Sequence, residues 1–135
     1  MKTNVLFAII AAGLLCPFAT LRAQDIDSMP PVVVKTVPEA ASKDVPPGEY
    51  EVKITFSKTM QDDSYSWVTA WTHSAPVVVE SPRFEADHKT CVLKVRLDAN
   101  TTYGWWLNTE KFQNFTDLQG HPSVPYLLVF KTGGK

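Results

Sequence analysis

Cysteine is almost absent from this 135-residue sequence. Its two cysteines are Cys16, in an apolar N-terminal segment, and Cys91, in the second half of the chain. If the N-terminal segment is removed on export, Cys91 has no partner and no disulfide can form within the domain. We therefore expect the folded protein to be stabilised by packing alone.

The sequence also lacks an excess of charge of one sign. Its 13 lysines and arginines nearly balance its 14 aspartates and glutamates, and neither kind is clustered. Nucleic acids and anionic membranes are recognised by clustered basic side chains. We therefore expect no nucleic-acid partner.

Long hydrophobic runs are absent apart from a short one at the N-terminus. Lys2 precedes an apolar stretch, Val5 to Leu15, and the small Ala23 precedes a polar segment. This order is typical of a secretory signal peptide, which we place at residues 1–23. Because a membrane-spanning helix needs about 20 apolar residues, we expect an exported mature chain, periplasmic or extracellular, that is not inserted in the membrane. The bulky Leu15 before Cys16 argues against lipid attachment there.

The motifs of common enzymes are missing as well. There is no Gly-x-Ser-x-Gly, no His-Glu-x-x-His and no glycine-rich phosphate loop. His73 and Ser74 are an adjacent base and nucleophile, but neighbours on one strand point to opposite faces. Cys91 alternates with polar residues in phase with Leu93 and Val95, which predicts a buried and inert thiol. We predict no catalytic residues, no cofactor and no enzymatic activity.

The three histidines form no recognisable metal motif. His73, His88 and His121 lie in separate predicted loops, whereas a metal site needs imidazoles that converge on one ion. The pair Phe56-Ser57 is similar to a strand start in periplasmic copper-carrier domains, but the region around Asp25 lacks an N-terminal metal-binding histidine. We therefore predict no metal site.

What the sequence does contain is a set of short segments with strand periodicity. Apolar and polar residues alternate from Tyr50 to Ser57 and again from Cys91 to Leu97, which predicts two half-buried strands. A strand with an aromatic face is predicted from Tyr65 to Trp71. Further strands are predicted at residues 32–37, 77–79 and 126–130.

The segment after Leu97 is typical of a tyrosine corner. A polar turn leads to Tyr103 and then to an aromatic strand. In immunoglobulin-like sandwiches the phenol hydroxyl at this place bonds to nearby backbone and fixes the crossing between the two sheets. We therefore predict an all-β fold, an immunoglobulin-like Greek-key sandwich of about seven strands over residues 32–135, after a short flexible lead-in at 24–31. The predicted core residues are Phe56, Trp67, Tyr103 and Trp105, with Trp67 at the centre.

Several short motifs occur in a sensible order along the chain. They are Val37-Pro38-Glu39-Ala40, Lys43-Asp44-Val45-Pro46, Ile54-Thr55-Phe56-Ser57-Lys58-Thr59-Met60, Asn100-Thr101-Thr102-Tyr103, Asp117-Leu118-Gln119-Gly120 and Phe130-Lys131-Thr132. Together they resemble the bacterial Ig-like domain of the SbsA surface-layer protein type. The resemblance spans essentially the whole mature chain and implies a β-sandwich module of exported and surface proteins without catalytic residues. It departs from the family at His121, where the usual turn has asparagine after the glycine.

Trp106 is the main candidate for a binding surface. If Tyr103 packs inward, period two turns Trp105 inward and directs Trp106 and Asn108 outward. An exposed indole suits docking of a protein or stacking on a sugar ring.

The predicted function is an exported, non-catalytic module with a structural or protein-interaction surface. The alternative is a carbohydrate-binding domain that uses Trp106 together with Trp71 or Tyr65, so the unknown partner is a protein or a glycan. A third hypothesis gives Trp106 no binding role, because a loop with Phe112 and Phe115 on one helical turn covers it.

Overall fold

The computed structural model describes Gly13 and residues 23–135. The predicted signal peptide therefore lies almost entirely outside the described residues, as does Cys16. The described part forms a short 3-10 turn, η1 (Ile26–Ser28), and seven strands. The strands are β1 (Val33–Val37), β2 (Gly48–Phe56), β3 (Trp67–Thr69), β4 (Val77–Phe84), β5 (Thr90–Leu97), β6 (Thr102–Leu107) and β7 (Tyr126–Lys131). In this part of the chain no helix has the length and apolar character needed to cross a membrane.

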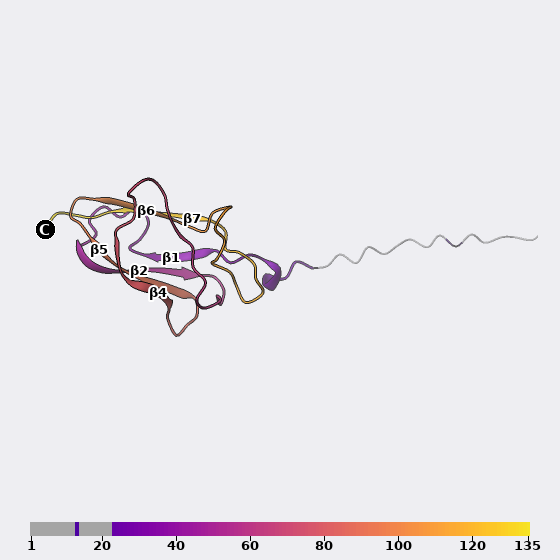
Figure 1. The fold of residues 1–135 in the computed structure, drawn as a ribbon. Coiled ribbons are helices and arrows are strands. Elements are labelled where there is room, and N and C mark those ends of the chain that lie inside the picture. Colours follow the sequence, from indigo (N-terminus) through magenta and orange to yellow (C-terminus); the bar gives the residue numbers. More distant parts are fainter. Residues whose placement is uncertain (1–12, 14–22) are drawn as a thin grey trace, which may run out of the picture.

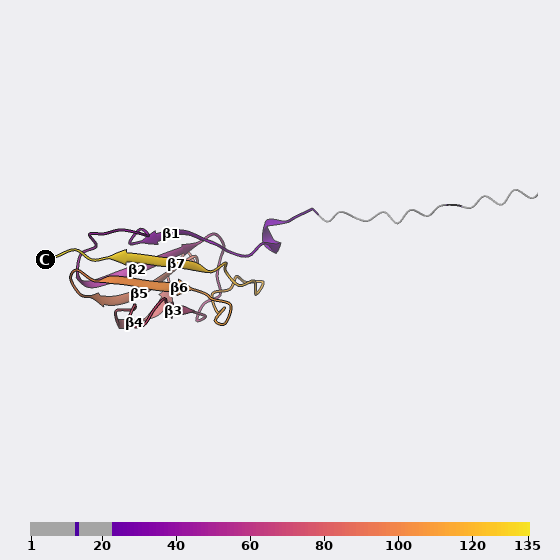
Figure 2. The same ribbon diagram turned by 90° about the horizontal axis from the view of Figure 1, so that it is seen from above.

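The strands form two antiparallel sheets packed face to face (Figure 1). One sheet has four strands in the order β1-β2-β5-β4, and the other has three in the order β3-β6-β7. The chain changes sheet between β2 and β3, between β3 and β4, and between β5 and β6, as Figure 2 shows from above. These are the connections of an immunoglobulin-like sandwich, so the predicted all-β fold of about seven strands is confirmed.

The core lies between the sheets and follows the period of two seen in the sequence. In β2 and β5, Val52 faces Leu93 and Ile54 faces Cys91, and all four side chains are buried. Burial of each large apolar side chain contributes about 1.5–3 kcal/mol to folding. The two alternating segments thus supply half of a core that holds the sheets together by packing.

Aromatic side chains fill the rest of the core. Phe56 packs on Phe115 with 5.0 Å between ring centroids, and Trp105 meets Trp67 edge to face at 5.4 Å. Trp67 is only half-buried, so it borders the core instead of occupying its centre as predicted. The reason is that β3 is a three-residue edge strand, which leaves one side of its side chains open.

Tyr103 forms the corner between the two sheets. Its hydroxyl oxygen accepts a hydrogen bond of 2.8 Å from the backbone N–H of Asp98, and the residue is 3% exposed. Its ring packs on Phe130 with 5.9 Å between centroids. This is the geometry expected of a tyrosine corner, and it sets the inward phase of Tyr103, Trp105 and Leu107 in β6.

Asn108 points inward, although the period of two predicts an outward side chain. Its backbone has a φ of 62°, so the alternation of β6 ends at this residue. The amide oxygen accepts from the N–H of Phe115 at 3.0 Å, and the amide nitrogen donates to the carbonyls of Phe115 and Ser123 at 2.9 and 3.1 Å. These bonds close the long connection between β6 and β7 around a buried amide.

Three other segments differ from the prediction. The strand expected from Tyr65 to Trp71 is limited to β3, because the chain turns away after Thr69. The expected helical turn at Phe112 and Phe115 does not form, and Phe112 is exposed while Phe115 is fully buried. The strand expected at 77–79 continues as β4 to Phe84, with register shifts that accommodate a proline on this edge strand.

Replacing Tyr103 with phenylalanine is expected to lower the free energy of unfolding by about 1–3 kcal/mol, because the Asp98 N–H then loses the hydroxyl of the buried Tyr103 as its acceptor. Urea unfolding followed by circular dichroism measures the change. Tyr50→Phe, on a half-buried tyrosine for which no side-chain hydrogen bond is found, is the matched control. Equal stability of Tyr103→Phe and the wild type would contradict this role of the hydroxyl.

Candidate functional site

The outer face of the four-stranded sheet is covered by charged side chains. Acidic and basic side chains of β2, β4 and β5 pair there, mostly across the strands. The ion pairs are Lys53–Glu85 at 2.6 Å, Lys94–Glu80 at 3.0 Å, Arg83–Glu51 at 3.2 Å and Arg96–Glu49 at 3.6 Å. Such exposed pairs contribute little to stability, but they make this face well hydrated.

The outer face of the three-stranded sheet is apolar. In the register of the strands, Trp106 lies between Val68 of β3 and Leu127 of β7. One step along the strands, Gly104 lies beside Val129. We call this surface the outer aromatic face and define it by Val68, Ala70, Trp71, Trp106, Leu127 and Val129. Of the outward residues of its three strands only Lys131, at one end, carries a charge.

The Trp71 ring reaches over Gly104 on this face, although Trp71 belongs to the turn after β3. A Cβ atom at Gly104 would lie 2.4 Å from Cζ3 and 2.6 Å from Cη2 of the indole. The ring therefore fills the space that a side chain at position 104 would need. Trp71 is still 44% exposed.

A buried serine holds the Trp71 turn in place. The Ser74 hydroxyl accepts from the N–H groups of Ala70 at 2.9 Å and Trp71 at 3.2 Å, and it donates to the carbonyl of Gly104 at 2.7 Å. In addition, the N–H of Gly104 donates to the Ser74 carbonyl at 2.9 Å. The indole is thus positioned by a network that is complete before any ligand binds.

Tyr65 lies away from the outer aromatic face. Its ring stacks on Phe84 with 5.7 Å between centroids and meets Phe115 edge to face at 6.3 Å, so it closes the edge of the core. Burial raises the pKa of the Tyr65 phenol, which therefore stays neutral. Tyr65 and Phe112 line a groove of about 370 Å³ along the open edge of β3, which we call the edge groove. The remaining lining residues are Ser66, Trp67, Val68, Thr69 and Asn114.

The structure thus brings two of the three predicted site residues together. Trp71 and Trp106 share the outer aromatic face, and Val68 connects that face to the edge groove with Tyr65. The hypothesis that a loop with Phe112 and Phe115 covers Trp106 does not hold for Phe115, which packs in the core on Phe56 and Trp67. Trp106 itself is half-buried. Sequence reasoning missed Gly104 and Ser74, although a glycine inside an aromatic strand signals a close approach of another group.

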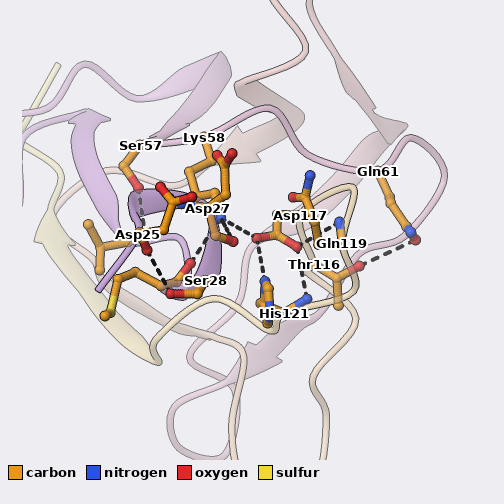
Figure 3. A network of polar contacts seen from close by, with 12 residues as sticks. Asp25, Asp27, Ser28, Ser57, Lys58, Gln61, Thr116, Asp117, Gln119 and His121 are labelled. Atoms are coloured by element: carbon orange, nitrogen blue, oxygen red, sulfur yellow. Dashed lines mark hydrogen bonds and ion pairs between the residues drawn. The ribbon is translucent and has the colours of Figure 1, made fainter. Parts of the chain in front are cut away.

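A second polar cluster surrounds Asp117 (Figure 3). The fully buried Asp117 carboxylate lies 2.6 Å from Lys58 Nζ and 3.0 Å from His121 Nδ1, and it accepts backbone N–H bonds from Gln119 and His121. Lys58 also donates to the carbonyls of Asp27 and Met29, so it joins the segment expected as a lead-in to the loop before β7.

The folded protein strongly favours the ionised form of the Asp117 carboxyl. Burial acts to raise its pKa, but the Lys58 ammonium and the N–H groups of His121 outweigh this effect and lower the pKa to about 2. The polar groups around the carboxylate are all bonded to it, as is typical of a carboxylate that stabilises a turn. We assign this cluster to the stability of the loop.

The remaining reactive residues are dispersed. His73, His88 and His121 lie in three different turns, and within the described ranges no three side chains of histidine, cysteine, aspartate or glutamate are placed to share an ion. His73 and Ser74 lie in the turn after β3, and the Ser74 hydroxyl is engaged with the backbone. Burial raises the pKa of the Cys91 thiol to about 12, so this cysteine is not a nucleophile near neutral pH.

Comparison with known proteins agrees with this architecture. A family model described as a bacterial Ig-like domain matches residues 27–132. Among solved structures, the chain is similar to CopC from Methylosinus trichosporium OB3b, with 20% sequence identity, 77% of this chain and 94% of that chain covered, and a TM-score of 0.55. The search of curated proteins finds no match. The chain belongs to the bacterial Ig-like domain family, with the two-sheet sandwich and tyrosine corner described above.

Replacing Gly104 with alanine is expected to displace the Trp71 ring from the sheet, because the new Cβ and the indole cannot occupy the same space. The emission maximum of tryptophan fluorescence should shift to longer wavelength as the indole becomes more hydrated. Repeating the substitution in a Trp71→Phe background is the control and should abolish most of the shift. An unchanged spectrum in Gly104→Ala would contradict the placement of the Trp71 ring over Gly104.

The low pKa of Asp117 predicts a loss of stability in acid. Because its pKa is lowered to about 2 in the folded state, the carboxylate stabilises the fold above about pH 4 and ceases to do so as pH falls through 2. This loss amounts to about 2 kcal/mol in the free energy of unfolding. Urea unfolding at several pH values should show that, between pH 4 and 2, the free energy of unfolding of Asp117→Asn depends less on pH than that of the wild type. Parallel curves for the variant and the wild type would refute the assignment.

Proposed function

We propose that this protein is an extracytoplasmic, non-catalytic Ig-like module that binds a partner through the outer aromatic face. The contrast between the two outer faces carries the proposal. One face bears charged side chains in ion pairs, whereas the other exposes Trp71 and Leu127 beside the half-buried Trp106. Contiguous apolar surface of this kind on a soluble domain is typical of an interaction site.

The N-terminal sequence pattern supports a location outside the cytoplasm. A positive residue, a short apolar run and a small residue before Gln24 are the features of a secretory signal peptide. The resemblance to Ig-like domains of the SbsA type points in the same direction, toward the periplasm or the cell surface. Balanced surface charge is compatible with either place.

The absence of catalysis is supported by the state of the candidate nucleophiles. The Ser74 hydroxyl is buried and bonded to three backbone groups, and the Cys91 thiol is buried with a high pKa. Neither group can attack a substrate at the surface without local unfolding. The outer aromatic face itself offers no acid or base except Lys131 at one end.

The proposal is tested by binding of the purified mature domain to the cell-envelope fraction of its source cells. We expect the envelope fraction to retain at least about tenfold less of the double variant Trp71→Ala/Trp106→Ala than of the wild type, since both indoles are removed. The matched control is Val77→Ala, which alters a residue that is 65% exposed on the edge of the other sheet. It should bind as the wild type does.

Circular dichroism and the melting temperature verify that each variant is folded. Retention of the double variant at the level of the wild type and Val77→Ala would reject the outer aromatic face as the binding surface.

A further inference from the structure

Resting on the proposed function, we propose that the partner on the outer aromatic face is a neutral saccharide chain. Its pyranose rings would stack on Trp71 and Trp106. A ring whose substituents are equatorial, as in a β-1,4-linked chain, presents a flat surface of C–H groups. Such a surface is complementary to the apolar face of an indole.

The first argument is the rigidity of the platform. Trp71 lies in the space left by Gly104, and its turn is held by two hydrogen bonds to the Ser74 hydroxyl within residues 70–74 and by two between Ser74 and Gly104. A ring positioned in advance loses little conformational entropy when a ligand stacks on it.

The second argument is the size of the apolar surface. With Trp71 44% and Leu127 41% exposed and Trp106 half-buried, these three residues offer roughly 200–250 Å² when about 250 Å² is taken for a free tryptophan. A standard protein interface takes about 800 Å² from each partner, more than half of it apolar. The surface is small for a stable protein interface and is of the size that a few sugar rings cover.

The third argument is the distribution of charge and hydrogen-bonding groups. The outer aromatic face has no charge apart from Lys131, so it complements a neutral ligand. The edge groove continues from Val68 and adds the exposed amide of Asn114, the Tyr65 side chain and the backbone of the edge strand β3. An apolar platform beside a polar groove matches the apolar faces and hydroxyl edges of a polysaccharide.

The two indoles lie over neighbouring outward positions of one strand. Trp71 lies above Gly104, and Trp106 follows two residues later on the same face of β6. Successive outward positions on a strand are about 7 Å apart. A saccharide chain that runs along β6 would therefore pass over both side chains.

The test is a depletion assay with three insoluble polysaccharides: β-1,4-glucan, the β-1,4-linked polymer of N-acetylglucosamine, and purified peptidoglycan. At least one of them should remove the wild-type domain from solution. We expect Trp71→Ala and Trp106→Ala each to weaken this binding by tenfold or more, and Trp71→Phe to retain most of it because an aromatic face is kept. Val77→Ala should bind as the wild type does.

A second measurement uses soluble oligosaccharides of the polymer that binds. Stacking should change the fluorescence of the wild type much more than that of the double variant Trp71→Ala/Trp106→Ala, which keeps only the buried Trp105 and the half-buried Trp67. This readout also distinguishes loss of stacking from loss of folding, because the buried tryptophans of a folded variant keep their emission.

Two outcomes would overturn the saccharide inference. One is no binding to any of the three polymers, and the other is binding that both alanine variants retain. If envelope binding depends on the two indoles but is abolished by protease treatment of the envelope and not by oligosaccharide competitors, the partner is a protein. In that case the proposed function stands and only the saccharide inference fails.

Discussion

The hydrogen bond from the Asp98 N–H to the Tyr103 hydroxyl is the constraint on which the rest of the molecule depends. It anchors the start of β6 against the other sheet, so Tyr103 can only point inward. Because side chains alternate along a strand, Trp105 and Leu107 then join the core, and Gly104 and Trp106 face outward. The outward positions of Gly104 and Trp106 in the outer aromatic face therefore follow from the inward position of the buried Tyr103 phenol.

The two faces of the sandwich are built by different means. On the four-stranded sheet, long charged side chains pair across strands and keep the surface hydrated. On the three-stranded sheet, the strands are short, and a neighbouring turn supplies an indole to a position where the strand has no side chain. Two tryptophans distant in sequence thus form one surface, although only Trp106 belongs to a strand.

The sequence predicted those elements whose side chains obey a simple period. β2 alternates strictly, β5 does so from Leu93 to Leu97, and the polar turn before Tyr103 has a recognisable chemistry, so the sandwich and most of its core could be derived. The predictions for Asn108 and Phe115 were wrong, because a positive φ at Asn108 ends the alternation and the loop then folds around its amide. Trp71 was assigned to a strand because periodicity does not detect a turn held by a serine.

What the sequence by itself determined is the fold class and the phase of its regular strands, since both follow from local alternation and from one corner motif. What only the tertiary structure decided is the shape of the candidate site. It depends on the contact of Trp71 with Gly104 and on the position of Tyr65 at the core edge. Contacts between residues some thirty positions apart arise from the packing of sheets and turns, which no local pattern encodes.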